Sequence, residues 1–115
     1  MIESCFSKEE LAVLEQAIDT YGWESQTDMM IEEMSELTQA LLKFRRARQN
    51  PTKKALALVS IHEEMADVEI MLCQMQMIYG NCAAERRYKL ERLAGDLKKE
   101  RNDVSRGCIA NAVSV

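Results

Sequence analysis

Apolar residues recur every three or four positions through most of the 115-residue chain, and long stretches that alternate apolar with polar residues are absent. A repeat of three to four residues places apolar side chains on one face of an α-helix. One proline and four glycines leave few breaks between these stretches. We therefore predict an all-α protein with four helices, over residues 7–20, about 25–48, 51–79 and 82–101.

The predicted helix ends carry recognisable capping residues. Ser7 can cap the first helix, and Glu10 three residues later completes a capping box. Gly22 and Gly80 are expected to end the first and third helices. Asn50 can cap the third helix, with proline at the first helical position. The third helix is unusually long, so a break between residues 54 and 60 is an open alternative.

No internal repeat, low-complexity segment or long linker divides the chain. We predict one helical domain over residues 1–101 and a C-terminal tail over 102–115, which lacks a clear period and is expected to be disordered or to pack on a partner. The length is enough for one domain of ordinary size, but burial of a good core within a single chain is not guaranteed. Association with a partner chain is therefore compatible with the length.

Two of the predicted helices each place a carboxylate in the apolar seam that should face a neighbour. On the second helix Glu33 interrupts a seam formed by Met30, Leu37, Ala40 and Phe44. On the third helix Glu64 interrupts a seam formed by Ile61, Val68, Met71, Met75 and Ile78. A second acid follows three residues after each, Glu36 and Asp67, on nearly the same face.

Four carboxylates that face one another repel and lose hydration, at several kcal/mol per unpaired buried charge. Neither seam carries a basic residue beside the acids. A divalent cation would neutralise them, and an all-oxygen ligand set favours Mg²⁺, with Mn²⁺ as a substitute. His62 lies on a different face from Glu64, which argues against a di-iron Glu-x-x-His site. The alternative from spacing alone is that Glu33 and Glu64 lie at a bundle edge and are solvated.

Charge and composition narrow the class of partner. The formal net charge of −4, with both signs interspersed, argues against a protein that holds a nucleic acid polymer on a basic surface. No export segment and no stretch long enough to span a membrane is recognised, so we predict a cytoplasmic protein. The four cysteines lack the spacing of a zinc site and are expected to be reduced thiols.

The two acidic motifs together resemble a known family. Glu32-Glu33-x-x-Glu36-Leu37 and Glu63-Glu64-x-x-Asp67-Val68, in order on consecutive helices, are similar to the paired EExxE and ExxD signature of the MazG-like nucleoside triphosphate pyrophosphohydrolases. The likeness extends from about residue 21 to residue 97, and it is strongest to short single-domain members.

The resemblance implies a four-helix MazG-like bundle completed by dimer or tetramer association. It implies hydrolysis of an NTP or dNTP to the monophosphate and pyrophosphate, with Glu33, Glu36, Glu64 and Asp67 holding Mg²⁺ as the metal and catalytic residues. Which of the four acts as the base stays open, as does the number of metal ions. Glu32 and Glu63 do not share the seams and are interpreted as supporting or solvated.

Other residues are weaker candidates for substrate contacts. Lys89 and Arg92 share a face of the fourth helix, where the family uses basic residues for phosphate, although ion pairs along an exposed helix explain them equally well. Lys43, two turns beyond Glu36, is a further phosphate candidate. It belongs to a basic cluster that a solvated helix end also explains: Lys43, Arg45, Arg46, Arg48, Lys53 and Lys54.

Trp23 and Gln26 are candidates for binding the base. An indole can stack on a base and an amide can read its edge. Gln26 lies seven residues before Glu33, on the inward stripe, and Trp23 lies three residues earlier. A lone tryptophan in a small domain is more often a core residue, and that alternative is favoured for Trp23.

Two other functions are compatible with the motifs. Phosphoribosyl-ATP pyrophosphohydrolase is the enzyme alternative, since it is also short and carries paired acids. A non-catalytic helical dimer, acting as an interaction module, is the alternative from another class.

Overall fold

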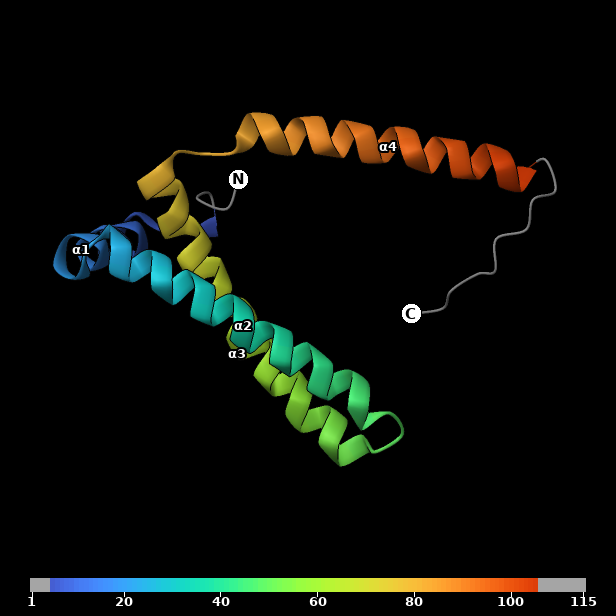
Figure 1. Cartoon of the computed structure of the whole chain (residues 1–115), viewed down its shortest axis with the longest axis horizontal. Coiled ribbons are helices and arrows are strands. Elements are labelled where there is room, and N and C mark those ends of the chain that lie inside the picture. Colours follow the sequence, from blue (N-terminus) through green and yellow to red (C-terminus); the bar gives the residue numbers. More distant parts are fainter. Residues whose placement is uncertain (1–4, 106–115) are drawn as a thin grey trace. The chain divides into compact units, whose positions relative to one another are not determined.

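The computed structural model of the chain describes residues 5–105, which form helices joined by short connecting segments and contain no strand. The helices are α1 (Lys8–Tyr21), α2 (Trp23–Ala47), α3 (Pro51–Tyr79) and α4 (Ala83–Ser105) (Figure 1). The chain divides into two compact units, Met1–Asn81 with the first three helices and Cys82–Val115 with the fourth. The prediction of an all-α protein is confirmed, whereas the single domain over residues 1–101 stays a prediction.

The predicted start of α1 is confirmed in detail. The backbone N–H of Glu10 donates to Ser7 Oγ over 3.0 Å, and the backbone N–H of Ser7 donates to Glu10 Oε1 over 2.8 Å. Gly22, at φ +89°, ends α1 and also caps the N-terminus of α2. Because glycine adopts this conformation without steric cost, one residue joins the two helices. Helix α2 therefore begins at Trp23, earlier than predicted.

The long third helix is continuous. Asn50 caps it by accepting a hydrogen bond from the backbone N–H of Lys53 over 3.0 Å. The 29 residues that follow contain no glycine and no internal proline, and Ala57 and Ile61 are buried along its first half. Packing on a neighbour supplies the stability that a long isolated helix lacks. The break considered between residues 54 and 60 does not occur.

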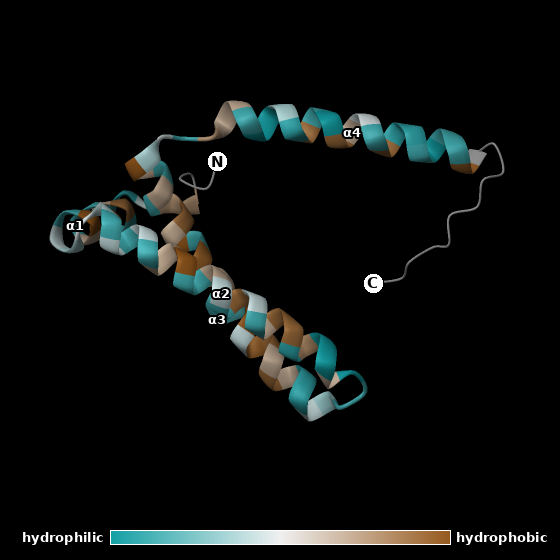
Figure 2. Cartoon of the chain, viewed as in Figure 1, coloured by the Kyte–Doolittle hydropathy of each residue, from teal (hydrophilic) through white to brown (hydrophobic). Residues whose placement is uncertain are grey.

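Helices α2 and α3 pack against each other along much of their length, and α1 contacts both (Figure 1). Every apolar residue of the two predicted seams is buried or half-buried. The seams thus form the core, as predicted from their spacing, and Leu14 of α1 adds to it. Apolar residues also lie outside this core along both helices (Figure 2).

Three helices meet in a hydrogen-bonded junction of glutamines. The side-chain amide of Gln26 on α2 donates to Gln74 Oε1 on α3 over 2.7 Å, and both residues are buried. The amide of Gln74 in turn donates to the backbone carbonyl of Leu14 on α1 over 3.2 Å. Buried amides that are paired in this way fix the relative position of the helices that carry them.

Helix α4 forms the second unit and is exposed along most of its length. It continues to Ser105, so residues 102–105, assigned to the tail from the sequence, are helical. The first strong breaker after Arg101 is Gly107, which explains the longer helix. The rest of the predicted tail, residues 106–115, lies outside the described residues.

Within residues 5–105, none of the helices combines the length and the apolar character needed to cross a bilayer.

Candidate metal centre

Three of the four predicted ligands come together in the middle of the α2 and α3 pair. Glu33 projects from α2, and Glu64 and Asp67 project from α3. One carboxylate oxygen from each lies within 4.8 Å of the other two. Ligand oxygens on opposite sides of Mg²⁺ lie about 4 Å apart, twice the usual bond length. Small side-chain rotations would therefore bring all three oxygens onto one cation.

Burial separates the seam carboxylates from their neighbours in the sequence. Glu33 and Glu64 are half-buried, whereas Glu32 and Glu63 are exposed. Glu33 Oε2 and Glu64 Oε2 are each fully buried and have no hydrogen-bond partner within the described part of the chain. The interpretation that Glu33 and Glu64 are solvated at a bundle edge is therefore wrong for these two oxygens.

Burial and mutual repulsion raise the pKa values of Glu33 and Glu64. Loss of hydration, followed by the charges of Asp67, Glu36 and Glu64, raises the pKa of Glu33 to about 7. Burial, followed by the charge of Glu36, also raises the pKa of Glu64. In the metal-free fold, the ionised forms of Glu33 and Glu64 are thus less favourable than in water. A cation is the group that would relieve both causes at once.

Glu36 occupies a different position from the other three. It is exposed and does not belong to the group of oxygens within 4.8 Å, yet its charge acts on both Glu33 and Glu64. It therefore lies at the rim of the cluster. Its role as a fourth ligand stays a prediction.

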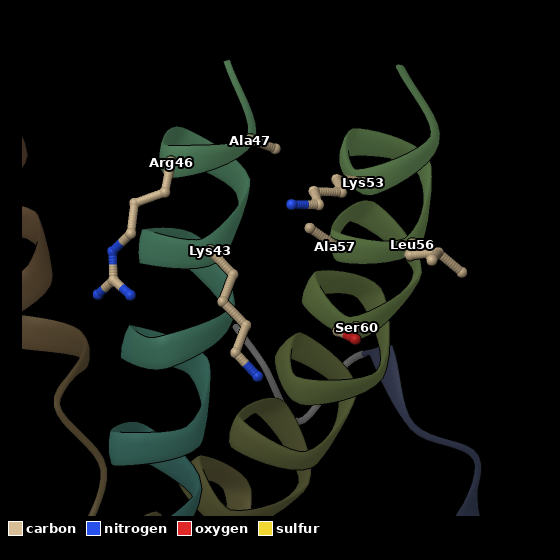
Figure 3. Close-up of a pocket in the computed structure, with 7 residues that line it drawn as sticks. All are labelled: Lys43, Arg46, Ala47, Lys53, Leu56, Ala57 and Ser60. Atoms are coloured by element: carbon tan, nitrogen blue, oxygen red, sulfur yellow. The ribbon is translucent and has the colours of Figure 1, made fainter. Parts of the chain in front are cut away.

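A basic hollow of about 380 Å³ lies farther along the same helix pair, near the turn between α2 and α3 (Figure 3). It is lined by Lys43, Arg46, Ala47, Lys53, Leu56, Ala57 and Ser60. Lys43 was predicted from the sequence as a phosphate candidate. Ser60 is one helical turn from Glu64, which relates the basic hollow to the carboxylate cluster.

An aromatic hollow of about 420 Å³ lies toward the other end of the pair, lined by Ile18, Trp23, Met77, Ile78 and Tyr79. The rings of Trp23 and Tyr79 meet edge to face, with centroids 6.5 Å apart. The hydroxyl groups of Tyr79 and Thr27 are 2.7 Å apart, which holds the tyrosine in place. Trp23 is 53% exposed, so the favoured interpretation of this residue as core is wrong for this chain.

Gln26 differs from Trp23, its partner in the predicted base site. Its side chain is buried and its amide donates to Gln74. The structure thus gives Gln26 a place in the core, and base binding by this residue stays a prediction.

Lys89 and Arg92 both lie exposed on α4, in the second unit. Their predicted contact with phosphate stays a prediction.

The sequence did not predict Lys53, Ser60 or Tyr79 as site residues. Lys53 belongs to the basic cluster noted in the sequence, but only the packing of α2 against α3 brings it to the same hollow as Lys43. Tyr79 lies 56 residues after Trp23, and no local spacing signals that contact.

Comparison of the chain with known proteins found no similar protein. No protein-family model matches the chain, and no curated protein or solved structure matches it.

Proposed function

We propose that this protein is an Mg²⁺-dependent nucleoside triphosphate pyrophosphohydrolase, which converts an NTP or dNTP to the monophosphate and pyrophosphate. The observation that carries the proposal is the cluster of Glu33, Glu64 and Asp67, two of which have buried carboxylate oxygens without a partner in the described chain. Oxygens left in this state are costly for a fold unless a ligand uses them. The paired motifs supply the resemblance to MazG-like enzymes.

The donor set fits a hard divalent cation. Glu33, Glu64 and Asp67 would hold it, with Glu36 at the rim as the fourth predicted ligand. When bound, Mg²⁺ would offset the negative charge of the triphosphate, and Mn²⁺ could replace it. The remaining chemistry needs a proton acceptor for the attacking water, and one of these carboxylates would provide it.

Hydrolysis in this proposal forms a bond between the water oxygen and the α-phosphorus. The bond from that phosphorus to the bridging oxygen breaks, and pyrophosphate leaves with the electron pair. One carboxylate accepts the proton of water. The exposed face of Trp23 offers a surface for the base, and Lys43 offers positive charge for phosphate.

We further propose that the protein acts as a homodimer or homotetramer in the cytoplasm, where nucleoside triphosphates are abundant. Support comes from large apolar side chains exposed on both core helices, among them Ile31 and Leu41 on α2 and Leu56 and Val59 on α3. Exposed apolar surface of this kind is typical of protein interfaces. The substrate is a free nucleotide and not a nucleic acid polymer.

A nucleotide panel with Mg²⁺ tests the proposed activity. We expect pyrophosphate release from at least one NTP or dNTP by the wild-type protein and by Glu63→Gln, which alters an exposed neighbour. Glu64→Gln should abolish release and leave helicity intact. Activity in Glu64→Gln would show that the site is misplaced.

The same panel separates the alternatives. Release from phosphoribosyl-ATP alone would favour the histidine-biosynthesis enzyme. No pyrophosphate from any nucleotide would leave the helical interaction module as the better explanation.

A further inference from the structure

The basic hollow gathers positive charge from two helices around an apolar floor. Lys43 and Arg46 come from α2 and Lys53 comes from α3 (Figure 3). The small side chains of Ala47 and Ala57 leave the space between the helices open, and none of the described residues that line it is acidic. Three cations around one hollow repel one another, and a bound anion would turn that repulsion into attraction.

Figure 3 shows how the two lysines are placed. The Lys53 side chain extends from α3 toward α2, and the Lys43 side chain points along the space between the helices toward Ser60. Both lysines line the basic hollow from different helices, so a multivalent anion bound there would have an ammonium group from each helix to contact. Arg46 points to the outer side of α2 and contributes mainly its charge.

The neighbouring Lys54 behaves differently. Its ammonium group lies 5.6 Å from the centre of the Phe44 ring, and it does not line the hollow. A cation over an aromatic ring is attracted to the ring face. The chain therefore provides two adjacent lysines of equal charge, of which only Lys53 belongs to the basic hollow.

The position of the hollow relates it to the carboxylate cluster. At 1.5 Å per residue, Ser60 lies roughly 6 Å along α3 from Glu64, and Lys43 lies roughly 10 Å along α2 from Glu36. Trp23 lies in the opposite direction, roughly 15 Å along α2 from Glu33. An aromatic hollow, a carboxylate cluster and a basic hollow thus follow one another along a single pair of helices.

This order matches the order of groups in a nucleoside triphosphate. A base stacks on aromatic surface, the cleaved phosphate needs the cation, and the terminal phosphates carry most of the negative charge. Pyrophosphate has nine heavy atoms and, at about 30 Å³ for each water-sized group, fits within 380 Å³.

We propose that the basic hollow binds pyrophosphate through Lys43 and Lys53, and so orients the substrate with its terminal phosphates toward the turn between α2 and α3. This inference rests on the proposed function, because pyrophosphate is the group that leaves in that reaction. The basic hollow then determines which end of the nucleotide becomes the leaving group. It also keeps the pyrophosphate bound after cleavage.

Calorimetric titration of inorganic pyrophosphate into the full-length, metal-free protein at low salt tests the inference. We expect binding by the wild-type protein, at least tenfold weaker binding by the double variant Lys43→Gln with Lys53→Gln, and a change of less than twofold in Lys54→Gln. All three substitutions alter exposed side chains, so thermal unfolding should confirm that both variants remain folded. Orthophosphate should bind more weakly than pyrophosphate, because it spans only one of the two lysines.

The inference would be overturned by absence of pyrophosphate binding by the wild-type protein, or by equal weakening in Lys54→Gln and in the double variant. Pyrophosphate binding does not depend on turnover, so it distinguishes this inference from the proposed function. Binding that requires Lys43 and Lys53 in a protein that cleaves no nucleotide supports the basic hollow and contradicts the enzyme. Turnover with pyrophosphate inhibition unchanged in the double variant supports the enzyme and contradicts the basic hollow.

Discussion

Two of the regions in which α2 and α3 bury polar side chains satisfy the hydrogen bonds of those side chains differently. At the junction with α1, Gln26 and Gln74 hydrogen-bond to each other and to the carbonyl of Leu14. In the middle of the pair, Glu33 and Glu64 each bury an oxygen without a partner among the described residues. The hydrogen bonds of the first region are complete within the chain, whereas the proposed cation would complete the second.

The contrast separates a structural role from the proposed functional one. A neutral amide can be satisfied by a neighbouring amide, so the glutamine junction stabilises the fold. Carboxylates placed together repel and cannot satisfy one another while both are ionised. Keeping these carboxylates together lowers the stability of the metal-free fold, and metal binding would raise it again. Substitutions in the two regions should therefore have opposite effects on stability.

The largest expected effect is on turnover by Glu33→Gln. Mutation of a residue that hydrogen-bonds a metal ligand lowers activity roughly 10- to 100-fold. Removing the charge of a ligand itself should have a larger effect, so kcat/KM should fall by at least about 100-fold. The free energy of unfolding of the metal-free variant should rise, because a buried charge is removed. Steady-state kinetics and urea unfolding measure the two effects. Glu32→Gln is the matched control and should change neither, since Glu32 is exposed.

Metal binding should stabilise the wild-type protein. At a Mg²⁺ concentration 100 times its Kd, mass action adds about 2.7 kcal/mol to the free energy of unfolding. Thermal unfolding with and without Mg²⁺ should show a Tm higher by several degrees in the presence of the ion. Asp67→Asn should remove most of this increase. An equal increase in wild type and Asp67→Asn would contradict the assignment of Asp67 as a ligand.

The glutamine junction should respond in the opposite sense. Gln74→Met keeps the side-chain volume but leaves the amide of Gln26 and the carbonyl of Leu14 without Gln74 as partner, so stability should fall by about 1–3 kcal/mol. Gln76→Met is the matched control, because Gln76 is also buried but neither of its amide atoms has a partner among the described residues. Urea unfolding should show no loss of stability for Gln76→Met.

A further effect concerns the pH dependence of the metal-free protein. Burial and neighbouring acids raise the pKa of Glu33 from 4.5 to about 7, so the folded state keeps this proton after the unfolded state has lost it. The stability due to this group is therefore fully present below pH 4.5 and is lost as the pH rises to 7. Urea unfolding in a chelator at several pH values should show this decline, and Glu33→Gln should flatten it. An unchanged slope in the variant would contradict a raised pKa for Glu33.

Much of the fold could be predicted from local pattern. The apolar seams were identified from three- and four-residue spacing, and all their members are buried or half-buried. The capping box at Ser7 and the cap at Asn50 were also correct, because each depends on residues three positions apart. The start of α2 was predicted too late, since Gly22 ends one helix and caps the next without a linker.

The site was only partly predictable. Spacing along each helix selected Glu33 and Glu64 as inward, but it ranked Glu36 and Asp67 equally, and only Asp67 joins the group of oxygens within 4.8 Å. Spacing placed Gln26 on the inward stripe without showing that Gln74 would meet it. These outcomes depend on the rotation of one helix against another, which no single helix encodes.

The sequence by itself determined which residues of each helix face inward, because the helical repeat fixes the direction of every side chain relative to its neighbours. It therefore identified two misplaced carboxylates before any packing was known. The tertiary structure decided which residues from different helices meet: Glu33 with Glu64 and Asp67, Trp23 with Tyr79, and Lys43 opposite Lys53. Such contacts arise from the relative shift and rotation of α2 and α3, which the whole core sets together.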